Sequence, residues 1–169
     1  MSEPVPEFSR LIPLSRLRGE PITEEIAATP AEREALARRF ELLSLERLAA
    51  TVELTRQRDS ILLRGAFEAE FVQSCVVTLE PVPGRLSERF SLRYGPPESE
   101  PDPSQTGADD EAFEPLSGDS IDLGEAVAQE LSLALPAFPR DPAALIEGLE
   151  AGSARGSAFA ALAGFTPKR

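Results

Sequence analysis

The sequence contains no histidine and no tryptophan, and it has only one cysteine and one methionine among 169 residues. The absence of histidine excludes Ser-His-Asp and Cys-His catalysis, histidine-ligated metal sites and the usual general base near neutral pH. The single cysteine, Cys75, can form neither a disulfide within the chain nor a zinc site of several thiolates,. An enzyme built on this chain would have to rely on carboxylates, Tyr94 or arginines alone.

Long apolar runs and known cofactor motifs are also missing. No stretch approaches the roughly 18 to 20 consecutive apolar residues of a membrane helix, and residues 1–7 lack the basic start and apolar run of a secretory signal,. The Gly-rich dinucleotide motif, the phosphate loop and the calcium loop are absent. We therefore expect a cytoplasmic protein without a cofactor, a metal or a membrane partner, and the free cysteine agrees with a reducing compartment.

The charge, by contrast, is large and unevenly placed, with a formal net charge of −12. Residues 94–139 hold 11 acidic residues and no Lys or Arg, whereas residues 1–93 are nearly balanced. Within the acidic block, residues 95–112 have almost no apolar side chains whose burial would offset the entropy lost on ordering. We predict one domain at residues 1–140, interrupted by a disordered acidic insertion at about 95–112 and followed by a flexible tail at 141–169.

Apolar and polar residues alternate with a period of two along the middle of the chain, which predicts an antiparallel meander. The alternating runs are Leu48–Arg56, Leu63–Leu79 and Leu86–Tyr94. The second run is long for one strand, so we expect a bend near Gly65 or Gln73.

Turns and shorter strands complete the predicted sheet. Gln57–Ser60 is expected to form a hairpin turn, and the prolines of Pro81–Gly84 are expected to interrupt the strand before alternation resumes,. Two further apolar stretches, Phe8–Leu14 and Ile22–Ala27, predict edge strands.

Two helices have clear start signals. Thr29 and Glu32 form the pattern of a capping box, and an apolar stripe of Leu36, Phe40 and Leu43 follows,. Asp122 is the predicted N-cap of a second helix, whose buried face would hold Leu123, Val127 and Leu131,. The expected fold class is α+β: a twisted antiparallel sheet packed by these two helices, with partial closure toward a barrel as an open alternative.

Three kinds of side chain are candidates for function. Cys75 has the apolar parity of its strand, so we interpret it as a small buried hydrophobe rather than a reactive thiol. Gln73 shares that parity and would need hydrogen-bond partners if buried. Arginines outnumber lysine 16 to one, and Arg85, Arg89 and Arg93 are candidates for contacts to RNA phosphates. The alternative for these arginines is an ordinary sheet surface with Arg–Glu cross-strand pairs.

Two segments of the chain resemble motifs of the YceD family, whose members are linked to the accumulation of large-subunit ribosomal RNA. The first, residues 69–82, reads AEFVQSCVVTLEPV and includes Gln73, Cys75, Thr78, Leu79, Glu80 and Pro81. The second begins with Asp122 and Leu123 and ends with Pro139 and Arg140. Many family members have a second cysteine three residues after the first, where this chain has Thr78. A metal or redox role based on such a pair is therefore not expected here.

The resemblance implies a process, ribosome biogenesis, and it provides no catalytic residues to transfer. We expect a non-catalytic factor that supports processing or accumulation of large-subunit ribosomal RNA, with that RNA or a pre-ribosomal particle as its partner. The alternative is an acidic chaperone or adaptor that binds a basic ribosomal protein without contacting RNA. The sequence does not fix the oligomeric state.

Overall fold

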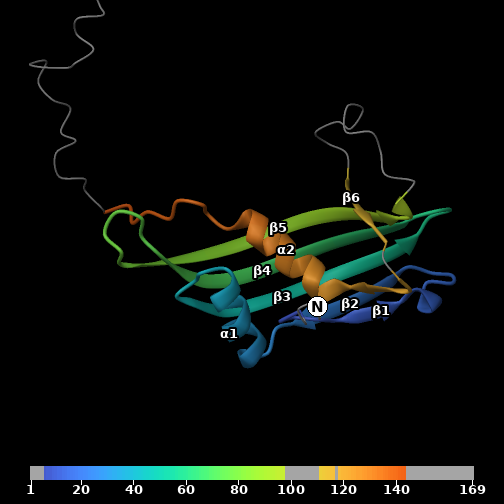
Figure 1. Cartoon of the computed structure of the whole chain (residues 1–169), viewed down its shortest axis with the longest axis horizontal. Coiled ribbons are helices and arrows are strands. Elements are labelled where there is room, and N and C mark those ends of the chain that lie inside the picture. The colour runs from blue at the N-terminus through green and yellow to red at the C-terminus, as the bar shows by residue number, and fades with distance from the viewer. Residues whose placement is uncertain (1–5, 98–110, 117, 144–169) are drawn as a thin grey trace, which may run out of the picture.

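The structure, a computed structural model, describes residues 6–97, 111–116 and 118–143 (Figure 1). It consists of a large twisted sheet, a small two-stranded sheet, two α-helices and one short 3-10 helix. The strands are β1 (Leu11–Pro13), β2 (Ile22–Ala27), β3 (Ser44–Arg56), β4 (Ile61–Ser74), β5 (Pro81–Gly95), β6 (Ala112–Pro115) and β7 (Ser120–Asp122). The helices are η1 (Leu14–Arg16), α1 (Pro30–Arg39) and α2 (Leu123–Ala134).

The large sheet has the order β2-β3-β4-β5-β6, and β1 pairs separately with β7. Strands β3 to β5 form the predicted antiparallel meander, and the predicted turn at Gln57–Ser60 joins β3 to β4. Strand β2 pairs with β3 as the predicted edge strand. The prediction of a purely antiparallel sheet is wrong, because β6 runs parallel to β5. The direction of a strand depends on the path of its connection, which the residue pattern does not encode. The sheet is open rather than barrel-like, since β2 and β6 lie at opposite edges.

The boundary between β4 and β5 differs from the prediction. Strand β4 is continuous, and the chain turns at Cys75–Thr78 instead of at the prolines. Pro81 and Pro83 lie within β5, which β6 covers only from Leu92 onward. A proline is tolerated there because the outer edge of the strand has no ladder hydrogen bond to lose. The irregularity expected in β4 lies in β3 instead, as a register shift after Leu45.

The predicted acidic insertion, 95–112, is partly corrected at its ends. Gly95 is the last residue of β5 and Ala112 the first of β6, so both belong to the sheet. The remainder of the predicted insertion, residues 98–110, lies outside the described residues, as does the predicted tail from residue 144 onward.

Both helix caps form as predicted. Thr29 Oγ1 accepts from the backbone N–H of Glu32 at 3.4 Å, and the Glu32 carboxylate accepts from that of Thr29 at 2.7 Å. Asp122 accepts from the N–H groups of the first turn of α2. The buried face of α2 is the predicted one, whereas Leu43 is exposed because α1 ends at Arg39.

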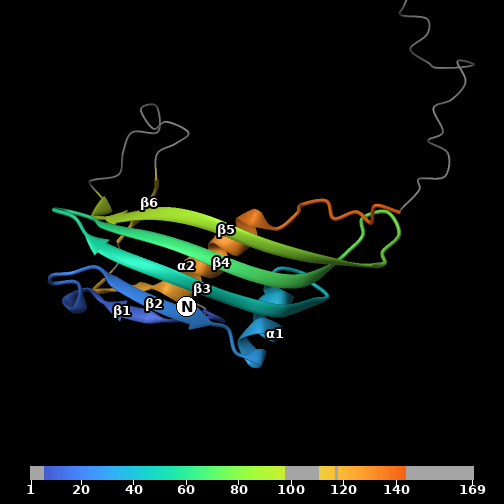
Figure 2. The same cartoon turned by 180° about the vertical axis from the view of Figure 1, so that it is seen from behind.

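The two helices cover one face of the large sheet (Figure 1), and the view from behind shows the other face without a helix over it among the described residues (Figure 2). Helix α1 packs against β3, and α2 packs against β4 and β5. The side chains between the layers form one hydrophobic core. The uncovered face carries the alternate residues of each strand, because neighbouring side chains point to opposite faces.

The N-terminal segment ties the starts of the two helices together. The Arg10 guanidinium donates to both carboxylate oxygens of Glu32, at 2.7 and 3.0 Å. The backbone N–H of Arg10 donates to Asp122, the N-cap of α2, at 2.7 Å. Because these contacts are far apart in sequence, they fix how α1 and α2 sit relative to one another.

Candidate functional site

The turn that follows β4 contains Cys75, the only cysteine of the chain. Backbone hydrogen bonds define the shape of this turn. The N–H of Cys75 donates to the carbonyl of Glu80 at 2.8 Å, and that of Leu79 donates back to the carbonyl of Cys75 at 2.9 Å. Leu79 has a φ of 62°, in the left-handed region that tight turns use,. Cys75 is therefore a turn residue rather than the strand residue predicted, and its burial is as predicted, with no exposed surface.

The segment that follows α2 packs across this turn. Gln73 Nε2 donates to the carbonyl of Pro136 at 3.0 Å, and the backbone N–H of Val76 donates to the carbonyl of Pro139 at 2.9 Å. The backbone N–H of Asp141 donates to Cys75 Sγ at 3.5 Å. Residues 73–80 and 136–141, distant in sequence, thus form one unit, which we call the Cys75 turn.

The environment of the thiol favours its ionised form. A hydrogen bond from the Thr78 side chain, supported by backbone N–H groups including that of Asp141, lowers the pKa of Cys75 to about 7,. The thiol is nevertheless covered by the Cys75 turn, so its reactivity depends on opening of that turn,. Cys75 is not part of the main hydrophobic core, which lies between sheet and helices.

The second candidate, the row of arginines on β5, lies on the uncovered face of the sheet. Arg85, Arg89 and Arg93 are all exposed and have the same strand parity,. The apolar residues of the other parity on β5 belong to the core or pack against it: Leu86, Phe90, Leu92 and Tyr94. The structure therefore brings the three predicted arginines together on one surface, which we call the β5 arginine row.

Carboxylates partly neutralise the β5 arginine row. Arg93 pairs with Glu111, and Arg85 lies 3.6 Å from Glu70, its cross-strand neighbour. The Arg85 side chain is 81% exposed, so this pair is weak and easily exchanged for another anion,. Arg89 forms no ion pair with any described residue and faces Ala66 across the ladder.

A sequence model described as "Large ribosomal RNA subunit accumulation protein YceD" matches residues 63–158, more than half of the chain. The chain belongs to the YceD family. No curated protein and no solved structure matches it.

The region matched to YceD contains both motif segments, the Cys75 turn and the β5 arginine row. Of the motif residues, Gln73, Cys75, Thr78 and Pro139 meet in the Cys75 turn. Asp122 and Leu123 do not join them: Asp122 caps α2 and Leu123 is buried beneath it. Several YceD motif positions therefore hold the fold rather than form a surface.

Thr78 stands where many YceD proteins have the second cysteine, and it still interacts with the first. Its side chain donates a hydrogen bond to Cys75. Within the described residues, no group of three or more His, Cys, Asp or Glu side chains is placed to hold a metal ion. None of the described helices is long and apolar enough to cross a membrane.

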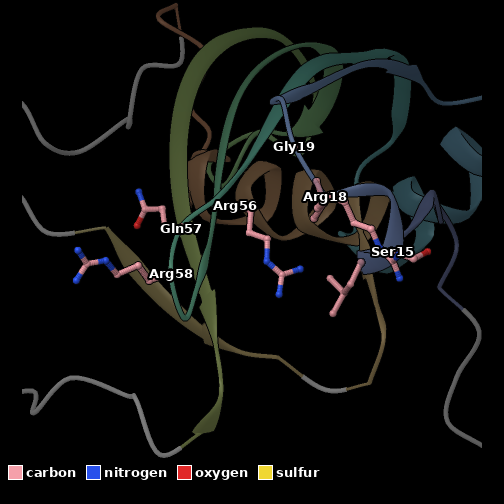
Figure 3. Close-up of a pocket in the computed structure, with 8 residues that line it drawn as sticks. Ser15, Arg18, Gly19, Arg56, Gln57 and Arg58 are labelled. Atoms are coloured by element: carbon pink, nitrogen blue, oxygen red, sulfur yellow. The ribbon is translucent and has the colours of Figure 1, made fainter.

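The sequence did not predict that Arg18 lies near Arg56 and Arg58. Arg18 follows η1, and it lies near the β3–β4 hairpin that carries Arg56 and Arg58 (Figure 3). All three precede the region matched to YceD. Their proximity depends on the pairing of β2 with β3, which places residues far apart in sequence side by side.

Proposed function

We propose that the protein is a non-catalytic factor that contacts large-subunit ribosomal RNA and supports its processing or accumulation. Membership of the YceD family supports the process, because the family is described by large ribosomal RNA subunit accumulation. The observation that carries the contact is the β5 arginine row, three exposed guanidinium groups on the sheet face left free by both helices. A guanidinium group can donate two parallel hydrogen bonds to two oxygens of one phosphate, and it stays charged at all relevant pH values.

The negative net charge of the molecule restricts where RNA could bind. With a net charge of −12, the whole chain repels a polyanion, so association needs a local positive surface,. Arg89 has no described carboxylate partner, and the loose Arg85–Glu70 pair can open at little cost,. RNA binding at this surface would therefore be weak at high salt and would strengthen steeply at low salt.

Co-sedimentation with pre-ribosomal particles tests the proposal. Charge reversal of Arg85, Arg89 and Arg93 to Glu should shift the protein from the particle fractions to the free fractions. The double variant Arg85→Glu/Arg89→Glu has a charge-matched control, Arg33→Glu/Arg38→Glu, which changes the net charge by the same amount on α1. The control should sediment as the wild type does. Unchanged sedimentation of the triple variant would contradict direct RNA contact through β5.

The second candidate, an adaptor for a basic ribosomal protein, is favoured by a different surface. Leu79 and Phe138 are 77% and 83% exposed. Leu79 lies in the first segment of the Cys75 turn, residues 73–80, and Phe138 lies in the second, residues 136–141. Large apolar side chains left this exposed are available for a protein contact. A pull-down from cells with and without ribonuclease separates the candidates: partners lost on ribonuclease treatment support RNA, and ribosomal proteins retained after treatment support the adaptor.

A further inference from the structure

A hollow of about 800 Å³ lies at the end of the large sheet remote from the Cys75 turn, between the β3–β4 hairpin and the loop after η1. Its charged lining residues are Arg18, Arg56 and Arg58, and no carboxylate of the described residues lines it. In an acidic chain this local composition is unusual, because carboxylates outnumber basic side chains 29 to 17. We call this feature the arginine hollow.

The three arginines come from separate places in the chain. Arg56 is the last residue of β3, Arg58 lies in the hairpin turn, and Arg18 follows η1. In Figure 3, Arg56 extends from its strand into the space beside the loop that carries Arg18, while Arg58 points outward from the hairpin. Arg18 and Arg56 thus border one space from two sides, whereas the Arg58 side chain points away from that space on the other side of the hairpin.

These guanidinium groups also lack the neutralisation found elsewhere in the molecule. Half of the arginines in the described residues form ion pairs with carboxylates, including Arg16, which pairs with Glu24 at 2.9 Å. Arg18, Arg56 and Arg58 form none with described residues. Adjacent cations without counterions raise the local positive potential, and an anion that enters the hollow relieves their mutual repulsion.

The uncharged lining suits an oxyanion. Ser15 contributes a hydroxyl, which can donate a hydrogen bond, whereas the Gln57 side chain points away from the space beside Arg56 (Figure 3),. Gly19 also borders the hollow, and a Cβ added there would meet no atom within 4 Å, so the backbone leaves room for a bound group. Two leucines complete the lining: Leu14 is half-buried and Leu17 is buried.

We propose that the arginine hollow binds a phosphate group, with Arg18 and Arg56 as the paired cations. Each guanidinium presents a fork of donors that matches two phosphate oxygens. The source of the phosphate is a phosphodiester of RNA, an identity that rests on the proposed function. The hollow is a separate site from the β5 arginine row, and it lies outside the region matched to YceD.

The test uses the full-length chain and two probes, inorganic pyrophosphate and a short single-stranded RNA. Nuclear magnetic resonance of the arginine side chains should show saturable shifts of Arg18 and Arg56 with pyrophosphate, and the RNA should compete for the same signals. The variant Arg18→Gln/Arg56→Gln should lose the pyrophosphate site and bind the RNA about fivefold more weakly at low salt. The charge-matched control Arg33→Gln/Arg38→Gln should retain both, and thermal melting checks that each variant is folded.

Each outcome decides a separate claim. Arg18 and Arg56 signals that do not move with pyrophosphate, or equal binding by the variant and its control, would overturn the phosphate site. Pyrophosphate binding without competition by RNA would overturn RNA as the source. Binding of both probes in a protein that fails to co-sediment with pre-ribosomal particles would support the hollow and contradict the proposed function instead.

Discussion

At the scale of single residues, Glu32 links stability to pH. Its carboxylate accepts from Arg10 and from the N-cap of α1, and these bonds, the Arg10 bond first, lower the pKa of Glu32 to about 2 from an ordinary 4.5. Because the folded pKa is depressed, the stabilisation is complete above about pH 4.5 and is lost as the pH falls toward 2,.

The variant Glu32→Gln isolates this effect. Near neutral pH it should lower the free energy of unfolding by about 1 kcal/mol, since the charge-assisted pair with Arg10 is lost while the Gln side-chain oxygen can still accept from the N–H of Thr29,. At about pH 3 the gap between wild type and variant should narrow. Urea denaturation at both pH values measures it. A gap that stays constant with pH would show that the Arg10–Glu32 pair does not stabilise the fold electrostatically.

Cys75 offers a second test at this scale, because Thr78 lowers the pKa of the thiol to about 7. The wild-type thiol should react slowly with a thiol reagent in the native state, because it is buried, and rapidly in denaturant,. Replacing Thr78 with Val removes the hydroxyl at similar volume, so the pH midpoint of native-state labelling should move upward. Fast native labelling, or an unchanged midpoint in Thr78→Val, would contradict the described environment of the thiol.

At the scale of elements, the contact of α2 with the N-terminal segment depends on a residue without a side chain. A Cβ on Gly124 would lie 2.4 Å from the backbone carbonyl oxygen of Phe8. Phe8 is fully buried and its backbone cannot move freely. Helix propensity alone predicts that Gly124→Ala stabilises α2 by about 1 kcal/mol, whereas the clash predicts the opposite sign.

We expect the clash to dominate, because overpacking against backbone costs about 1 to 3 kcal/mol or more. Gly124→Ala should therefore lower the melting temperature, and Gly19→Ala, at a position with no atom within 4 Å of the new Cβ, is the matched control. Thermal unfolding followed by circular dichroism measures both. A stabilised Gly124→Ala variant would mean that α2 sits farther from Phe8 than described.

At the scale of the whole molecule, signals that are local in the sequence predicted the strands and the helix starts better than they predicted the long-range arrangement. The alternation through Leu63, Phe67 and Phe71 placed the core face of β4, and Thr29 and Asp122 placed the two helix starts. These signals act within a few residues, so a single sequence contains them. The prolines of β5 were expected to interrupt the strand, but the strand continues through them. They are tolerated because that part of β5 lies at the edge of the sheet, where no ladder hydrogen bond is lost.

The candidate sites show the same division. The β5 arginine row was predicted because its members share one strand and one parity. The contact of Gln73 with Pro136 and the approach of Arg18 to Arg56 were not predicted. Both join segments whose proximity is decided by strand order and by the path of the chain after α2, neither of which a residue pattern specifies.

The central claim is that arginines on the uncovered sheet face contact large-subunit ribosomal RNA, and the salt dependence of binding tests it most directly. The affinity of the purified chain for a single-stranded segment of that RNA should fall linearly with salt on a logarithmic plot. In the variant Arg85→Glu/Arg89→Glu/Arg93→Glu the slope should be shallower by roughly 2, the value for three lost phosphate contacts. Equal slopes and equal affinities for the two proteins would contradict the account.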